Sequence, residues 1–272
     1  MFFLRLWSWQ QLLLCLLAAL ILLPLVVAFL TSGWPPGSLV EFELLPKEGW
    51  SWGSYLQAWH LGHFIRAFGN STLVALGVTG LQIFTSALAG YALARMRFPG
   101  QNLVLLLVLA SLVIPFQLLV IPIFMILRWG HLINTFGALI LPIAANGFGI
   151  FLMRQFFLTI PVSLEEAAAL DGASRWQILW QILLPLSRPA LVTLFLFTFI
   201  GEWNDLFKPL VFTTKPELIT VQLALANFQE QFTNDWPLMM AAIVISTIPV
   251  ALVFIVGQKQ FIRGIATTGV KN

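Results

Sequence analysis

Long unbroken runs of apolar residues dominate the chain, without the alternation of a half-buried strand or the amphipathic stripe of a soluble helix. A transmembrane helix needs about 20 apolar residues, because each residue rises about 1.5 Å through a hydrocarbon core of about 30 Å. Six runs satisfy this requirement, so we predict six transmembrane helices. They span approximately residues 12–30, 73–93, 103–127, 136–157, 189–207 and 238–256.

The composition agrees with a membrane protein. Apolar residues make up 59% of the 272 residues and charged residues only 9%, whereas soluble domains carry about 25% charged residues. We therefore predict an all-α integral membrane protein, and we assign residues 1–272 to a single domain because no Gly- or Ser-rich linker divides them. A net charge of +3 over this length is too diffuse to indicate a nucleic-acid partner.

The distribution of charge predicts the topology. An even number of spans places both termini on one side of the membrane, and lysine and arginine concentrate on the cytoplasmic side. With the N-terminus inside, nine of the fourteen basic residues and only three of the eleven acidic residues fall on the inner side. Both termini are therefore expected in the cytoplasm.

The first apolar run has a second interpretation. A short basic start with Arg5 followed by a leucine-rich run also describes a cleavable secretory signal peptide. The run is long for such a peptide, and no clear small-x-small cleavage site follows Pro24. We favour an uncleaved anchor. The Trp-rich segment after it could form an interfacial helix over residues 52–68, or a loop that lies along the membrane.

The inner loop at residues 158–188 is too polar to cross a bilayer and too regular to be a loose connector. Its central sequence is PVSLEEAAALDGASRWQILWQILLP. Ser163 is a suitable helix N-cap, and Glu165 and Glu166 follow in the first turn, where negative charge complements the helix dipole. Three alanines then favour helix. We predict a first short helix here.

A glycine turn and a second helix follow. Gly172, after Asp171, suits the left-handed conformation that ends a helix, and Ser174 can cap a second helix that runs to about Leu184. Such a helix-turn-helix presents carboxylates and small alanine side chains toward the cytoplasm. It could dock into a groove of a partner protein that offers basic residues, or it could be a loop with a solvated acidic face, and chemistry alone does not separate these alternatives.

The run EEAAALDGA, followed by ILLP, resembles the signature loop with which permeases of bacterial binding-protein-dependent ABC importers dock onto their ATPase. The resemblance extends over residues 70–272. The segments that carry it, NSTLVALGVTG, LAGYALARMRFPG, IPIFMIL, NTFGALILP, GEWNDLFKPLVFTT and QKQFIRGIATTGVKN, are similar to the shorter, six-span permease of maltose-type sugar importers.

The resemblance implies a function and a set of partners. The chain would be one transmembrane domain in a bacterial inner membrane, with a second permease, two ATP-binding-cassette ATPase subunits and an extracytoplasmic solute-binding protein. The solute would be a sugar or a related compound: an oligosaccharide, a polyol, a glycosylated osmolyte or a glycerol phosphate ester. Coupling to the ATPase would fall to a set of residues in the inner loop. These are Glu165, Glu166, Ala167, Asp171 and Gly172.

The sequence gives no sign of catalysis or of a cofactor in this chain. It has no phosphate-binding G-x-x-x-x-G-K-[ST] sequence, so ATP hydrolysis is expected in a separate subunit. Its one cysteine, Cys15, lies in an apolar run, and its three histidines are scattered, so we expect no metal site. The basic tail at residues 258–272 could reach the ATPases, or could be a solvated topology anchor.

Polar residues in or near the spans are candidates for the solute path, because polar groups are costly in lipid unless they face a cavity or a neighbouring helix. Amides and carboxylates suit sugar hydroxyls, and an aromatic face suits a sugar ring. Helix packing and capping use the same residue types, so both roles stay open. The candidates are Asn134, Asn146, Trp203, Asn204 and Asp205.

Two rival functions remain at this point. One is a secondary transporter, or another polytopic membrane protein that needs no ATPase, although ion coupling normally uses an ionisable pair within the membrane. The other is a membrane-embedded enzyme, for which no cluster of catalytic residues is visible. Only an importer permease should purify together with an ATPase and a second permease.

Overall fold

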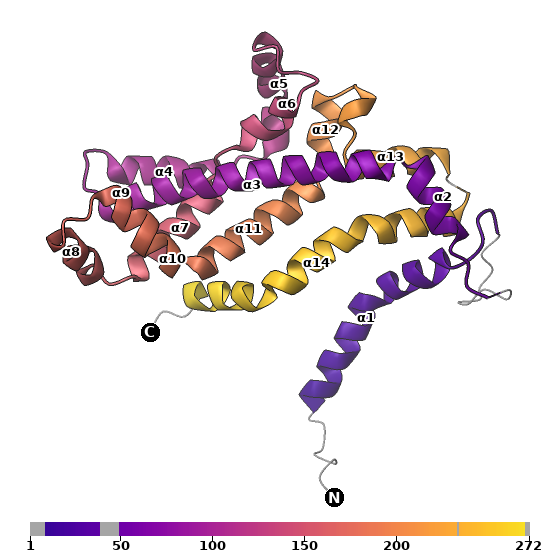
Figure 1. Cartoon of the computed structure of the whole chain (residues 1–272), viewed down its shortest axis with the longest axis horizontal. Helices are drawn as coiled ribbons and strands as arrows, with labels where there is room; N and C mark the ends of the chain where they lie inside the picture. The colour runs from indigo at the N-terminus through magenta and orange to yellow at the C-terminus, as the bar shows by residue number, and fades with distance from the viewer. Residues whose placement is uncertain (1–8, 39–48, 233, 270–272) are drawn as a thin grey trace, which may run out of the picture. The chain divides into compact units, whose positions relative to one another are not determined.

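A computed structural model describes residues 9–38, 49–232 and 234–269, with side chains described as far as residue 262. Within these ranges all regular structure is helical (Figure 1), which confirms the predicted all-α class. The chain forms two compact units. One consists of Met1–Ile65 and Ala224–Ile248, and the other of Arg66–Leu223 and Pro249–Asn272.

The first unit contains α1 (Trp9–Ser32) and α2 (Gly53–Leu61), together with most of α13 (Val221–Gln231) and the first part of α14 (Trp236–Gly269). The structure does not form the continuous interfacial helix suggested for residues 52–68. α2 ends at Leu61 because His63 adopts a left-handed conformation with φ of 49°, which breaks the helical path before α3 begins.

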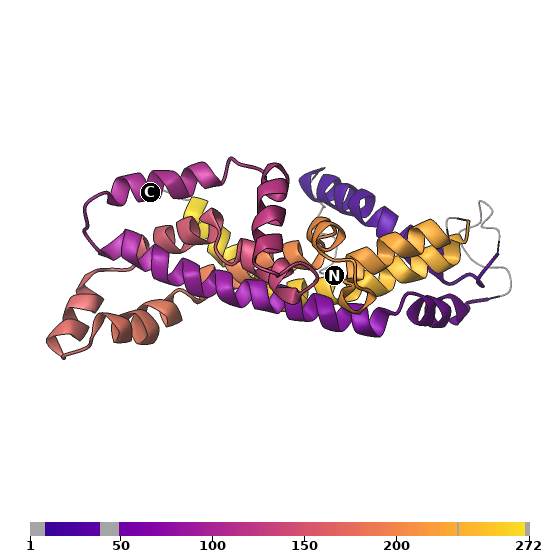
Figure 2. The ribbon, with the colours of Figure 1, turned by 90° about the horizontal axis from the view of Figure 1, so that it is seen from above.

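The second unit holds most of the remaining elements, and Figure 2 shows them turned by 90° from the view of Figure 1. They are α3 (Phe64–Arg95), α4 (Gln101–Ser111), η1 (Phe116–Leu119), α5 (Val120–Trp129), α6 (Phe136–Ile140), η2 (Leu141–Ile143), α7 (Gly147–Thr159), α8 (Ser163–Leu170), α9 (Arg175–Gln177), the π-helix η3 (Ile178–Leu183), α10 (Leu184–Leu186), α11 (Arg188–Trp203), α12 (Phe207–Phe212) and η4 (Pro216–Leu218).

Among the described residues, three helices are long and apolar enough to cross a membrane by themselves: Trp9–Ser32, Phe64–Arg95 and Trp236–Ile262. Three further helix pairs reach the required length only as bent pairs, with bends of 96° within residues 101–129, 46° within residues 136–159 and 78° within residues 175–203. The structure therefore has between three and six potential spans. The apolar run at residues 103–127, in particular, is not one straight helix.

A proline accounts for the sharpest bend. Pro115 lies between α4 and η1, and a proline disfavours helical geometry in the residue before it and donates no backbone hydrogen bond. Pro142 lies in the break between α6 and α7. Two carbonyl groups freed at that break, those of Ile143 and Ala144, accept hydrogen bonds from Gln82 at 2.7 Å and from Thr85 at 3.0 Å. Side chains of α3 thus satisfy the interrupted backbone.

One apolar core of the second unit lies at the end where α3 finishes. It joins α3, α7, η3 and α11 through buried side chains such as Tyr91, Phe157 and Leu194. The rings of Tyr91 and Phe157 meet edge to face, with centroids 6.3 Å apart. Ala168 of α8 and Ala173 of the following turn pack against this core. The core therefore fixes the base of the helix-turn-helix segment.

Candidate functional site

α8 and α9 form the predicted helix-turn-helix, although the first helix begins differently from our expectation. α8 starts at Ser163 itself, and the residue before it, Val162, is already helical, with φ of −64° and ψ of −27° and no side-chain cap. Backbone amides of Glu165 and Glu166 donate to the Val162 carbonyl at 2.9 and 3.1 Å. The predicted capping role of Ser163 is therefore wrong, because the backbone before it already closes the first turn.

The turn and the second cap agree with the prediction. Gly172 has φ of +86°, the left-handed region that favours glycine. Ser174 caps α9 in a capping box with Gln177: its hydroxyl accepts from the Gln177 backbone amide at 3.3 Å, and the Gln177 side chain accepts from the Ser174 amide at 2.8 Å. The helical path then continues through η3 and α10 to Leu186, slightly beyond the predicted end.

The helix-turn-helix has an inner and an outer face. Ala168 and Ala173 face the core, whereas Glu166, Ala167, Asp171 and Gly172 are exposed. Figures 1 and 2 both place α8 and α9 at the end of the second unit where α3 terminates, with α8 outermost. Leu170, an apolar residue of the outer face, is 89% exposed. The outer face thus combines acidic groups, small side chains and an exposed leucine.

Glu165 is the exception among the predicted coupling residues, because its carboxylate is already paired. The Arg95 Nε donates to Glu165 Oε1 at 2.5 Å, and both side chains are about 90% buried, with 10% and 11% of their surfaces exposed. Sequence reasoning assigned no role to Arg95. The only available signal was a basic residue at the predicted inner end of a span.

The predicted solute-path residues Asn134 and Asn146 both bind within the chain. The Asn134 carbonyl oxygen accepts from the backbone amides of Thr214 at 2.5 Å and Lys215 at 3.3 Å. The Asn146 side chain caps α7 by accepting from the Gly149 amide at 2.6 Å, and its NH2 donates to Gln82 Oε1 at 2.5 Å. Both asparagines stabilise the ends of helices through these hydrogen bonds.

Trp203, Asn204 and Asp205 lie together at the end of α11, and the structure gives each an internal partner. Trp203 is 2% exposed and packs edge to face on Phe68, with ring centroids 5.5 Å apart. The Asn204 NH2 donates to the Ile200 carbonyl at 2.9 Å. Asp205 forms an ion pair with Lys208 at 2.8 Å.

Lys208 was not predicted as a site residue, yet it is 6% exposed and bound by two carboxylates. Besides Asp205, Glu202 pairs with its ammonium group, at 2.7 Å. The three-residue spacing from Asp205 to Lys208 was a usable signal, because side chains so close in sequence can meet across the start of a helix. Asp205 lies just before α12, and its Oδ1 accepts from the Phe207 amide at 2.9 Å. The buried cluster holds the short helix α12 against the end of α11.

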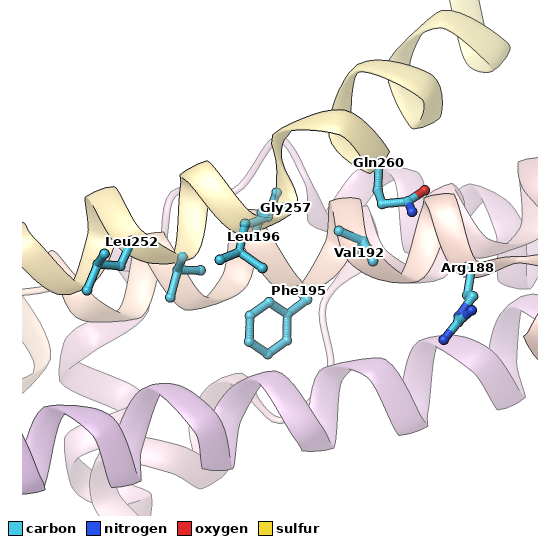
Figure 3. Close-up of a pocket in the computed structure, with 9 residues that line it drawn as sticks. Arg188, Val192, Phe195, Leu196, Leu252, Gly257 and Gln260 are labelled. Carbon is cyan, nitrogen blue, oxygen red and sulfur yellow. The ribbon is translucent and has the colours of Figure 1, made fainter.

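A pocket of about 570 Å³ lies between α11 and α14 in the second unit. Figure 3 shows Arg188 and Gln260 toward one end of it, and Leu252 toward the other. Its walls are mostly apolar, so the pocket has a polar end and an apolar body. Its lining contains none of the predicted solute-path residues. The lining residues are Arg188, Val192, Phe195, Leu196, Leu252, Val253, Val256, Gly257 and Gln260.

Neither site offers a group of metal ligands. In the part of the chain that the structure describes, no three His, Cys, Asp or Glu side chains come together in a way that could hold a metal ion. The chemistry available at both sites is therefore that of hydrogen bonds, ion pairs and apolar contact.

Comparison with known proteins yields a family match. Residues 82–267 match the family described as binding-protein-dependent transport system inner membrane component. The matched region includes the helix-turn-helix, the Arg95 contact and the α11–α14 pocket.

Individual relatives cover most of the chain. The arabinooligosaccharides transport system permease protein AraQ of Halalkalibacterium halodurans is 34% identical over 205 residues, which are 75% of this chain and 74% of that protein. The sn-glycerol-3-phosphate transport system permease protein UgpE of Yersinia pestis is 32% identical over 259 residues, 90% of this chain and 91% of that protein. A solved bacterial ABC transporter, involved in import of the acidic polysaccharide alginate, contains a chain that is 27% identical, with a TM-score of 0.80 over 93% of this chain and 95% of that one.

Proposed function

This chain belongs to the family of binding-protein-dependent transport system inner membrane components, and from that premise we propose that it is a permease through which a sugar or sugar-related solute enters the cell. The named solutes of its relatives, arabinooligosaccharides, sn-glycerol-3-phosphate and alginate, fall in or near the predicted class of oligosaccharides and glycerol phosphate esters. Membership of this family argues against the two rival interpretations, a secondary transporter and a membrane-embedded enzyme.

The proposed assembly contains a second permease, two ATPase subunits and an extracytoplasmic solute-binding protein. This chain supplies no nucleotide chemistry, since its sequence lacks a phosphate-binding loop. Closure of the ATPase dimer around ATP would displace α8, and rigid-body rocking of the spans would then open the solute path outward. Transport would thus be driven by motion of the ATPase subunits on the cytoplasmic side of the membrane.

The observation that carries this proposal is the outer face of α8. Glu166 and Ala167 are exposed on a short helix whose inner face is fixed to a core, and Asp171 and Gly172 are exposed in the turn that follows it. Small side chains allow a partner to approach closely, and exposed carboxylates can pair with basic groups that the partner brings. Glu165 also belongs to the predicted coupling set, and its carboxylate pairs with Arg95 inside the chain.

The proposed topology has six spans, both termini in the cytoplasm, and α8 and α9 on the cytoplasmic side, all within one transmembrane domain of residues 1–272. Its support is the excess of basic residues in the predicted inner segments. The three long helices and three bent pairs allow six spans if each bent pair crosses once. The end of the basic tail, residues 270–272, lies outside the described residues, and its contact with the ATPases stays a prediction.

The solute contacts predicted for Asn134, Asn146, Trp203, Asn204 and Asp205 also stay a prediction. The internal partners of these side chains would compete with a solute. A hydroxyl of a sugar could replace an internal bond only where the helices separate during transport.

Co-purification tests the proposed function. An affinity-tagged chain extracted from its native membrane in mild detergent should bring down an ATPase and a second permease. ATP hydrolysis by this complex should rise when the matching binding protein is added with arabinooligosaccharides or sn-glycerol-3-phosphate as trial solutes. Recovery of the chain without any nucleotide-hydrolysing protein would contradict the proposal, whatever the solute.

A further inference from the structure

Arg95 joins three helices at the base of the helix-turn-helix. It is the last residue of α3, and its Nε donates to Glu165 Oε1 at 2.5 Å in the first turn of α8. Its Nη2 donates to the backbone carbonyl of Ile160, the residue that follows α7, at 2.6 Å. One guanidinium group therefore ties the end of α3 and the end of α7 to the start of α8.

The electrostatics favour this arrangement. A cation is stabilised at the C-terminal ends of α3 and α7, and a carboxylate at the N-terminal end of α8, by the partial charges of the helix termini. Arg95 and Glu165 are also almost buried, so removing either partner leaves an uncompensated charge. The planar guanidinium reaches two acceptors at once, which the single ammonium group of a lysine does less well.

The two adjacent carboxylates of α8 therefore have different surroundings. Glu165 points inward to Arg95, whereas Glu166 is exposed on the outer face. Residues next to each other on a helix point about 100° apart. The pair EE in the sequence thus separates into an inner and an outer group, which the sequence alone treated as one.

We propose that Arg95 and Glu165 form an internal link that makes α8 and α3 move together, so that Glu165 positions the docking helix while Glu166 and the outer alanine face contact the ATPase. Arg95 is then a positioning residue of the transport cycle. This inference rests on the proposed function, since it concerns how motion of a docked α8 reaches a continuous helix of 32 residues.

Distance measurement between the two helices tests the link. Spin labels are placed at Leu81→Cys on α3 and Ala169→Cys on α8, both exposed, in a Cys15→Ser background, and the assembled complex is measured without nucleotide and with ATP plus vanadate. With Arg95 and Glu165 intact, we expect one narrow distance that is the same in both states. Arg95→Glu should keep the ATPase bound but shift or broaden the distance when ATP and vanadate are added.

A charge swap supplies the decisive comparison. Arg95→Glu combined with Glu165→Arg should restore the narrow distance in both states, because the ion pair is re-formed with reversed sign. Glu166→Gln is the matched control: it should lower the amount of ATPase recovered and leave the distance unchanged. If Arg95→Glu does not accumulate in the membrane, the milder Glu165→Gln takes its place, with the same expected shift.

Two results would overturn the link. The first is an unchanged narrow distance in both states for Arg95→Glu or Glu165→Gln. The second is a distance that is already broad without nucleotide together with loss of the ATPase, since the ion pair would then merely fold the helix-turn-helix. Failure of the proposed function looks different, because the unaltered chain would then recover no ATPase at all.

Discussion

Gly172 is the residue on which the shape of the helix-turn-helix depends most directly. Its φ of +86° is unfavourable for any residue with a Cβ, while the space around a Cβ at this position is open. Substitution therefore acts through the backbone alone. A left-handed residue other than glycine costs about 1–2 kcal/mol, asparagine tolerates the conformation best, and β-branched residues tolerate it worst.

We expect Gly172→Val to lower solute uptake while the protein still inserts into the membrane, because the strained turn displaces α8 from its docking position. Gly172→Asn is the matched control and should retain most of the uptake. Uptake by membrane vesicles, normalised to the amount of permease, measures both. Equal uptake by the two variants would show that transport does not require the left-handed turn at residue 172.

The Gln82 side chain forms three hydrogen bonds with residues outside its own helix. Besides the Ile143 carbonyl, it binds the side chains of Asn146 and Thr198, the latter at 2.8 Å. Gln82→Leu should lower the melting temperature of the purified protein, since each buried polar group left without a partner costs about 1–3 kcal/mol. Gln258→Leu, at a glutamine that bonds only within its own helix, should change it little. A similar melting temperature for both variants would contradict this role.

The conformation and contacts of a residue were predictable from the sequence where its interaction partner lies close to it in the chain. The left-handed Gly172 and the Ser174 cap follow from local rules, and the structure confirms both. The pairing of Arg95 with Glu165 joins residues 70 positions apart, and that of Gln82 with Asn146 joins residues 64 apart. Local patterns predict that such groups need partners, but only the packed helices determine which partners they find.

At the scale of helices, α3 and α7 cross where Gly90 allows close approach. A Cβ at Gly90 would lie 2.9 Å from the backbone nitrogen of Arg154 and 2.9 Å from the Cβ of Met153, closer than such atoms pack. Gly80 lies on the same helix with nothing within 4 Å of the corresponding position. The two glycines therefore form a natural pair for comparison.

Gly90→Ala should destabilise the protein by about 1–3 kcal/mol, because overpacking forces α3 and α7 apart. Gly80→Ala should be neutral or stabilising by about 0.5–1 kcal/mol, since alanine favours helix. Thermal unfolding in the same detergent compares the two variants with the parent. An unchanged melting temperature for Gly90→Ala would mean that the helices are not held as closely as the structure has them.

Prolines explain why helix existence was predictable and helix continuity was not. Pro24 and Pro249 lie inside the continuous helices α1 and α14. Pro115 and Pro142 lie at breaks, and the apolar runs around them give no sign of the difference. A break is tolerated where other side chains satisfy the freed backbone groups, as Gln82 does for Ile143. Whether a proline breaks a helix in this chain therefore depends on tertiary packing.

At the scale of the whole molecule, the topology makes a direct prediction. In a Cys15→Ser background, Lys215→Cys should react with a membrane-impermeant maleimide added to intact spheroplasts, because its loop is expected outside. Asp171→Cys should react only after the membrane is permeabilised. Both residues are exposed in the structure of this chain, so burial within the chain does not account for a difference between them. The ATPase is removed from the membranes with urea before permeabilised samples are labelled, so that a docked partner does not cover Asp171→Cys. Labelling of Asp171→Cys from outside would reverse the proposed orientation.

The central proposal is that the exposed face of α8 binds a separate ATPase. Cross-linking from Ala167→Cys, in a Cys15→Ser background, measures this most directly, because Ala167 is exposed and its side chain is small. With a short bifunctional reagent in native membranes, we expect an adduct between this chain and a nucleotide-hydrolysing protein, identified by mass spectrometry. An adduct only with proteins that hydrolyse no nucleotide, or no adduct while the same cysteine reacts freely with maleimide, would contradict it.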